Sequence, residues 1–252
     1  MDAIINQLVA IALLSLRIAP TLAFAPPFTL IRIPALVRMS LAIGVAAWMA
    51  ASNAAATWDS DYWVQGLPIT AAAELFLGMS LALALQLAFA MIAMMGRAID
   101  IQAGFGLALL VDPTTRAQAP LIGTILSYGA AAVFFMTDGP SDVMALFSIS
   151  LDHIPLGMTG LPDRLGPLFG YLSIVSVMAL GLVGLLLLAM LLIDLTVALL
   201  SKTLPQMNVL LLGFQVKAMA TLLLLPATMG LAVGGFARLM RLAIDSPLLL
   251  LG

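Results

Sequence analysis

The run PLFGYLSIVSVMALGLVGLLLLAMLLI (residues 167–193) contains no charged side chain. A helix needs about 20 consecutive apolar residues to cross a membrane, and proline is favoured at the first position of a helix, which suits Pro167. If this helix continues to Leu200, it is about 50 Å long, against a hydrocarbon thickness of about 30 Å. The run therefore predicts a membrane-spanning helix that is longer than the bilayer is thick.

The rest of the chain has the same apolar character. Of its 252 residues, 63% are hydrophobic and 9% are charged, whereas soluble domains carry about 25% charged residues. Further uncharged runs cover residues 39–58, 75–96 and 117–137, and both ends of the chain add apolar segments. The alternating pattern of barrel strands is missing, so only helices can satisfy the backbone inside hydrocarbon. The sequence predicts an all-α polytopic membrane protein with about six long helices.

The apolar segments predict helices over residues 3–24, 34–56, 67–96, 119–135, 167–200 and 208–244, with a short amphipathic helix within 138–160 and a kink at Pro226. The N-terminus has no basic region before its apolar segment, so we expect the first helix to be retained. The basic and acidic turns favour six spans with both termini on the non-cytoplasmic side, but Arg238 and Arg241 contradict this topology.

Several classes of function lack support in the sequence. The chain has no cysteine, so disulfides and cysteine-bound zinc are excluded. Its net charge is −2 and no two basic residues are adjacent, so we expect no nucleic-acid partner. Metalloprotease, hydrolase and nucleotide-binding motifs are missing, and the single histidine, His153, reads as a solvated loop residue. We therefore predict no enzymatic activity, no cofactor and no metal site.

Two polar stretches interrupt the apolar sequence, GRAIDIQAGFGLALLVDPTTRAQAP (residues 96–120) and SKTLPQMNVLLLGFQVK (residues 201–217). Gly104, Gly106 and Pro113 predict irregular backbone in the first stretch. Irregular backbone survives at membrane depth only inside protein or beside water. In the second stretch, Pro205 ends the long helix, and Gln206 and Asn208 can bond the freed backbone groups. The second stretch predicts a tight helical hairpin that packs against neighbouring subunits.

Arg17, Glu74 and Asp194 lie within apolar helices. A central arginine or aspartate costs about 2.5 to 3.5 kcal/mol on insertion scales, so none of the three is expected to face lipid. Two interpretations remain open. Each side chain either makes a satisfied packing contact or lies near the membrane surface, or it faces a lumen or a partner subunit.

Three methionines, Met91, Met94 and Met95, share one helical face directly before Gly96, where we expect the helix to end. Methionine usually fills irregular gaps in a core, and this is one interpretation. The other is a deformable seal around a passage.

Small residues on two of the predicted helices permit close helix approach. They are Gly181 and Gly184 on the long helix, and Gly230 and Gly234 on the last helix.

Four segments arrive in the order and at the spacing of one family. They are the N-terminal pattern of Arg17, Pro20, Pro26, Pro34 and Arg38, the stretch GFGLALLVDPTTR (residues 104–116), DHIPLG (residues 152–157) and LPQMNVLLLGF (residues 204–214). Over nearly the whole chain this pattern resembles the FliR family of flagellar biosynthetic proteins and its injectisome counterparts. The chain departs from the family pattern at Arg97 and Gln215.

The resemblance implies a subunit of a type III protein export gate in the bacterial inner membrane, at the flagellar basal body. Its implied partners are several copies of FliP and FliQ, FlhB, membrane lipid, and the unfolded flagellar proteins that pass through the assembly. Residues 1–252 would form a single helical domain, with N-terminal helices (1–96), a plug-like loop (97–118) and C-terminal helices (119–252). The runner-up interpretation is a stand-alone secondary transporter with broken helices, and a membrane-embedded enzyme is a weaker third.

Within that gate, two sets of residues are expected to act. The predicted pore plug comprises Gly104, Phe105, Gly106, Val111, Asp112, Pro113, Thr114, Thr115 and Arg116, with Met91, Met94 and Met95 as its seal. The predicted intersubunit packing residues are Arg17, Gly181, Gly184, Asp194, Pro205, Gln206, Asn208, Gly213 and Phe214.

Overall fold

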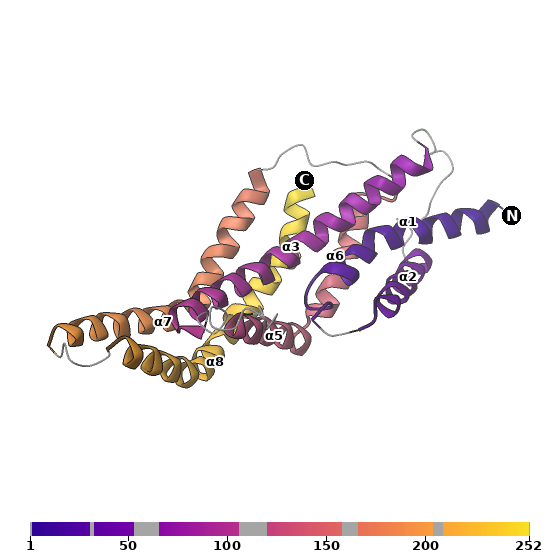
Figure 1. Ribbon diagram of the computed structural model, residues 1–252. Helices are drawn as coiled ribbons and strands as arrows, with labels where there is room; N and C mark the ends of the chain where they lie inside the picture. The colour runs from indigo at the N-terminus through magenta and orange to yellow at the C-terminus, as the bar shows by residue number, and fades with distance from the viewer. Residues whose placement is uncertain are drawn as a thin grey trace. The chain divides into compact units, whose positions relative to one another are not determined.

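The computed structural model describes residues 2–30, 33–52, 66–105, 120–157, 166–203 and 209–251 (Figure 1). These residues form seven helices and no strand: α1 (Asp2–Phe24), α2 (Ala35–Ser52), α3 (Leu67–Gln102), α5 (Leu121–Met136), α6 (Gly139–His153), α7 (Gly166–Thr203) and α8 (Val209–Leu251). By length and composition five of them can cross a membrane, or up to six if α5 and α6, which meet at a 73° bend, form one span. The predicted all-α polytopic class is confirmed.

Three predicted helix ends are wrong. Helix α8 continues to Leu251 instead of ending at Ile244. Helix α3 does not end at Gly96 but continues to Gln102. Glycine lowers helix propensity by only about 1 kcal/mol, which a tertiary contact can offset, and a Cβ at Gly96 would lie 2.6 Å from the backbone nitrogen of Gly123. Helix α7 also exceeds its prediction, since it runs from Gly166 to Thr203. Its 38 residues correspond to about 57 Å of helix.

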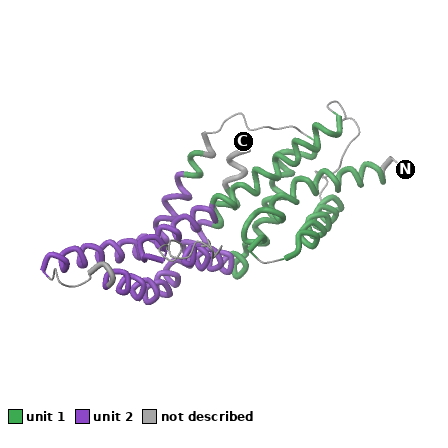
Figure 2. Tube along the Cα trace, viewed as in Figure 1, with its two compact units in different colours: residues 1–87, 134–172, 240–252 green, residues 88–133, 173–239 purple. Residues whose placement is uncertain are grey.

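The contacts divide the chain into two compact units (Figure 2). Unit 1 comprises residues 1–87, 134–172 and 240–252. Its core includes Leu14, Ile18 and Leu22 of α1, Leu77 and Leu81 of α3, and Phe147 of α6, all of them buried. Phe28, Phe134 and Phe135 add three edge-to-face ring contacts, with centroids 5.2 to 6.1 Å apart. Apolar side chains at helical spacing therefore build this core.

Unit 2 comprises residues 88–133 and 173–239 (Figure 2). Helix α7 buries one stripe within it, formed by Val175, Ala179, Val183, Leu186 and Met190. The opposite stripe, which includes Val177, Leu188, Leu191 and Leu195, stays exposed. Both units take residues from before and after the 97–118 segment, and the description of residues 1–252 as a single gate domain remains a prediction.

Close packing of α1 against α3 depends on Gly78. A Cβ at this position would lie 2.8 Å from the carbonyl oxygen of Leu16 and would overlap the carbonyl group of Arg17. Pro20 has no N–H to donate to the carbonyl of Leu16, so that carbonyl is free for this contact. Backbone atoms cannot rotate away as a side chain can.

We therefore expect Gly78→Ala to destabilise unit 1 by about 1 to 3 kcal/mol through overpacking. The measurement is the thermal unfolding midpoint of the protein in detergent. Gly44→Ala is the matched control, because Gly44 also lies in a helix of unit 1 and a Cβ added to it would meet nothing within 4 Å. Equal midpoints for the two variants would contradict the prediction.

Candidate functional site

The candidate site is the base of the segment predicted to act as a plug, where α3 ends and α5 begins. After Gln102 the amide of Ala103 donates to the carbonyl of Ile99 at 2.7 Å, and that of Gly104 to Ile101 at 3.2 Å. Gly104 has a φ of +83°, a left-handed conformation that favours glycine at the end of a helix. On the far side Pro120 directly precedes α5. The irregular backbone predicted at Gly104 thus follows directly after the end of α3 at Gln102.

Asp100 connects the end of α3 to the start of α5, the two helices on either side of the predicted plug. Its Oδ1 accepts a hydrogen bond from the amide of Ile122 at 3.0 Å, and its Oδ2 accepts from Ile122 at 3.2 Å and from Gly123 at 3.4 Å. The first amides of a helix lack partners within the helix, and a carboxylate there also suits the positive end of the helix dipole. Asp100, 5% exposed, therefore caps α5 from the end of α3.

Helices α3 and α5 approach each other most closely at this same point. Besides the contact between Gly96 and Gly123, a Cβ at Gly123 would lie 2.9 Å from the carbonyl oxygen of Ala93. Neither glycine has room for a side chain, so the two backbones lie in direct contact. This close crossing, together with the Asp100 bonds, holds the end of α3 against the start of α5, on either side of the predicted plug.

Phe214 brings a second motif to the base of the plug. A Cβ at Gly104 would lie 2.6 Å from Cδ1 of the Phe214 ring and 3.1 Å from its Cε1. The sequence predicts Gly104 in the plug and Phe214 in intersubunit packing, but the structure places them in contact within unit 2. Phe105 is the last residue that the structure describes before residue 120. The other predicted plug residues, from Gly106 to Arg116, lie outside the described residues.

A separate polar cluster lies inside unit 1 around Arg17, which is fully buried. Its Nε donates to Oε2 of Glu74 at 2.6 Å, and its Nη2 donates to Oε1 at 2.9 Å. Its Nη1 donates to the carbonyls of Ser150 at 3.2 Å and Ile154 at 2.9 Å, while the amide of Gly157 donates to Glu74 at 3.2 Å. The cluster thus ties α1 and α3 to the DHIPLG segment.

For Arg17 and Glu74 the satisfied packing contact is therefore the interpretation that the structure shows. Every hydrogen-bond partner of Arg17 in the described part of the chain belongs to this chain's own helices and loops. A role of Arg17 in intersubunit packing remains a prediction. Ser150 and Gly157 were not predicted as partners, although the DHIPLG motif overlaps the loop that supplies Gly157. Most of these partners are backbone carbonyl and amide groups, which every residue type has, so the sequence does not indicate which residues supply them.

Other predicted packing residues divide between contact within the chain and open space. Asp194 of α7 forms an ion pair with Lys217 of α8, and a Cβ at Gly213 would lie 3.2 Å from Val197, so both contacts lie within the chain. A Cβ added to Gly181 or Gly184 would meet no atom within 4 Å, which leaves room for another chain. Pro205, Gln206 and Asn208 lie outside the described residues.

The three methionines do not present one uniform surface. Sδ of Met91 lies 3.5 Å from the hydroxyl of Ser176, Met94 is 59% exposed, and Met95 is partly buried. Their role as a seal remains a prediction.

Within the described ranges no group of three or more histidine or acidic side chains is arranged to hold a metal ion.

Comparison with known proteins assigns a family to this arrangement. The profile of "Bacterial export proteins, family 1" matches residues 8–243. The chain belongs to this family. It is 26% identical to the flagellar biosynthetic protein FliR of Bacillus subtilis over 89% of this chain and 88% of that protein. It is 25% identical to FliR of Escherichia coli over 63% of this chain and 61% of that protein, and 27% identical to FliR of Pectobacterium carotovorum over 57% and 55%.

Removal of the Asp100 carboxylate is expected to loosen the base of the plug. In Asp100→Ala the amides of Ile122 and Gly123 lose their buried acceptor, which should cost about 0.5 to 2 kcal/mol, as for the loss of a helix N-cap. Hydrogen exchange of the first turn of α5 should become faster while α6 is unaffected. Asp152→Ala is the control, since Asp152 is exposed and its side chain makes no hydrogen bond or ion pair with the described residues. Unchanged exchange at α5 would count against the capping role.

Proposed function

We propose that this chain is a subunit of a flagellar protein export gate in the bacterial inner membrane, where the segment from Gly104 to Arg116 plugs a passage for unfolded exported proteins. Membership of the bacterial export family and similarity to proteins named FliR support the export role. The resemblance to FliR further suggests FliP, FliQ and FlhB as partners, and we propose no enzymatic activity for this subunit.

One observation carries the plug proposal: Asp100, near the end of α3, accepts the first amides of α5, so the two helices that flank the segment are held together. A plug must be fixed at its base so that it returns to the same position after it is displaced. The capping bonds, the direct contact of Gly96 with Gly123 and the Phe214 ring against Gly104 supply such a base. The apolar residues between Gly106 and Asp112 can then close a passage to ions, while the ends of α3 and α5 beside the plug stay fixed.

The buried acids argue against the transporter alternative. Acidic side chains at membrane depth commonly bind the coupling proton or cation of a transporter. Glu74 is paired with Arg17, and Asp100 accepts backbone amides. These are the two fully or nearly fully buried acids among the residues that the structure describes, and neither is free.

Deletion of residues 110–115 tests the plug. We expect the assembled complex to conduct ions in planar bilayers far more than the parent complex, because the passage loses its obstruction while its base remains. Thr221→Ser is a suitable control, since it keeps the hydroxyl that donates to the backbone carbonyl oxygen of Lys217 in unit 2. The proposal is wrong if the deletion variant assembles with its partners and conducts no more than the parent.

A further inference from the structure

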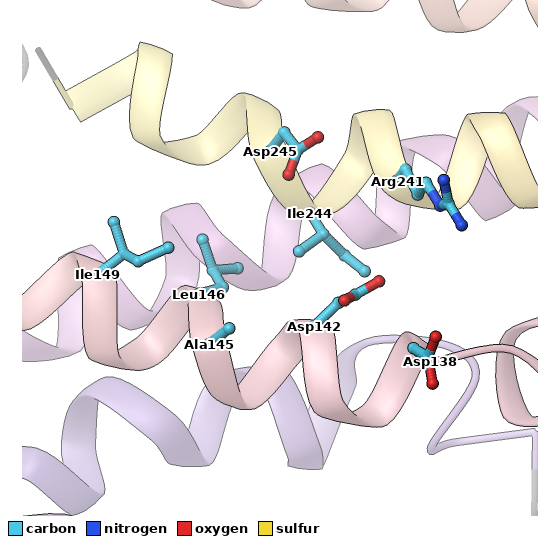
Figure 3. A pocket seen from close by; sticks show the side chains of 8 residues that line it. All are labelled: Asp138, Asp142, Ala145, Leu146, Ile149, Arg241, Ile244 and Asp245. Carbon is cyan, nitrogen blue, oxygen red and sulfur yellow. The ribbon is translucent and has the colours of Figure 1, made fainter.

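A groove of about 300 Å³ lies between α6 and the last turns of α8, both within unit 1 (Figure 3). Asp142 of α6 and Asp138, the residue directly before α6, line one side of it, and Arg241 and Asp245 line it from α8. Arg241 and Asp245 are four residues apart and lie on the same face of α8. The amide of Asp142 donates to the carbonyl of Asp138 at 2.8 Å, so these two residues lie one turn apart at the start of α6. The groove therefore carries charged groups from two helices that are far apart in the sequence.

These four charged side chains have no hydrogen bond or ion pair among the residues that the structure describes, in contrast to Arg17 and Glu74. Three of them are carboxylates and one is a guanidinium, which leaves a net charge of −2 at neutral pH. Arg241 does not pair with any of the three carboxylates. The groove thus has unused capacity for cationic groups.

The floor of the groove is apolar. Leu146 of α6 and Ile244 of α8 are buried, and Figure 3 shows Asp142 and Ile244 directed into the space between the two helices. An apolar centre with a charged, solvent-accessible rim is the usual composition of a protein interface. A volume of about 300 Å³ is at the lower limit of ligand pockets and suits a few side chains rather than a large cofactor.

We propose that this groove binds a segment of another protein in which at least two lysine or arginine side chains flank an apolar one. The apolar side chain would lie against Ala145 and Ile149, the exposed apolar residues that line the groove above the buried Leu146 and Ile244, and the cationic groups would pair with the carboxylates of the rim. Complementary charge of this kind favours the correct partner and speeds its association. The inference does not depend on the plug and stands even if residues 110–115 prove dispensable for closure.

Two other occupants fit the groove less well. A single metal ion would need converging ligands, and no group of three acids or histidines in the described part of the chain is arranged to hold one. Anionic lipid headgroups would be repelled by the net charge of −2. Zwitterionic headgroups would leave that charge uncompensated. A net cationic protein segment satisfies both the rim and the floor.

Cross-linking in the assembled complex tests the proposal. A photoreactive amino acid is placed at Ala145, which is exposed and lines the groove, and the linked peptide is mapped by mass spectrometry. We expect a peptide of a different protein that contains at least two basic residues. The double variant Asp142→Asn/Asp245→Asn should lower the yield about tenfold, because it removes two rim charges. Asp152→Asn, on the same helix but outside the groove, should leave the yield unchanged.

Several results would overturn the proposal: a peptide without basic residues, a link only to lipid or to this chain itself, or an equal loss of yield in Asp152→Asn. If the double variant does not assemble, salt replaces it as the test. Raising the ionic strength of the parent complex from about 0.05 M to about 0.5 M shortens the range of charge interactions severalfold and should lower the yield. A yield that is insensitive to salt would also overturn the proposal.

Discussion

Replacement of Glu74 by alanine is expected to destabilise unit 1 by about 3 to 5 kcal/mol, because it leaves the guanidinium of Arg17 buried without its counter-charge. Arg17 is 0% exposed and Glu74 is 1% exposed, so water cannot take over the lost interactions. Whole domains have unfolding free energies of only about 5 to 15 kcal/mol. We therefore expect little folded protein to accumulate in cells that express Glu74→Ala.

The measurement is the amount of folded protein in detergent extracts, together with the thermal unfolding midpoint of what is recovered. Arg17→Met/Glu74→Leu is the informative control, because replacing both charges by apolar groups of similar size is often close to neutral. Its recovery should be partial, since the carbonyls of Ser150 and Ile154 still lose their donor. A Glu74→Ala variant as stable as the parent would show that the pair contributes nothing.

The long helices could be predicted because a run of about 20 apolar residues is sufficient to indicate a membrane-spanning helix. The same reasoning predicted that Arg17, Glu74 and Asp194 do not face lipid, since an unpaired charge in hydrocarbon is costly. It did not identify the partners. Hydropathy along one chain carries no information about which helices lie together, so the pairing of Arg17 with Glu74 and of Asp194 with Lys217 required the three-dimensional structure.

The base of the plug shows a different limit of sequence reasoning. Asp100 lies at the start of a polar stretch and was not predicted as a site residue, although it is the residue that caps α5. Gly96 was predicted to end the helix because the polar stretch begins there, whereas its contact with Gly123 explains its place inside α3. Capping across a loop and backbone contact between helices both depend on tertiary structure. Gly104, by contrast, was predicted to have irregular backbone, and its φ of +83° lies outside the helical region.

The exposed stripe of α7 raises the question of what covers it. Within the most apolar window of this helix only 28% of residues are buried inside the chain. Val177 and Leu191, for example, are 67% and 58% exposed. The helix is about 57 Å long, whereas hydrocarbon covers about 30 Å, so tilt alone leaves part of this apolar surface outside lipid. Such a surface requires protein contacts.

We therefore expect the chain to aggregate or to be degraded when it is expressed alone, and to be rescued by co-expression with its two smaller proposed partners, FliP and FliQ. Gly181→Leu/Gly184→Leu should abolish most of that rescue, because it adds bulk where nothing now lies within 4 Å and overpacking at such contacts costs about 1 to 3 kcal/mol. The matched control is Gly181→Ala/Gly184→Ala, which adds little volume and should still assemble. Size-exclusion chromatography of detergent extracts measures both results. A monodisperse, thermally stable monomer would contradict the prediction and favour a stand-alone transporter.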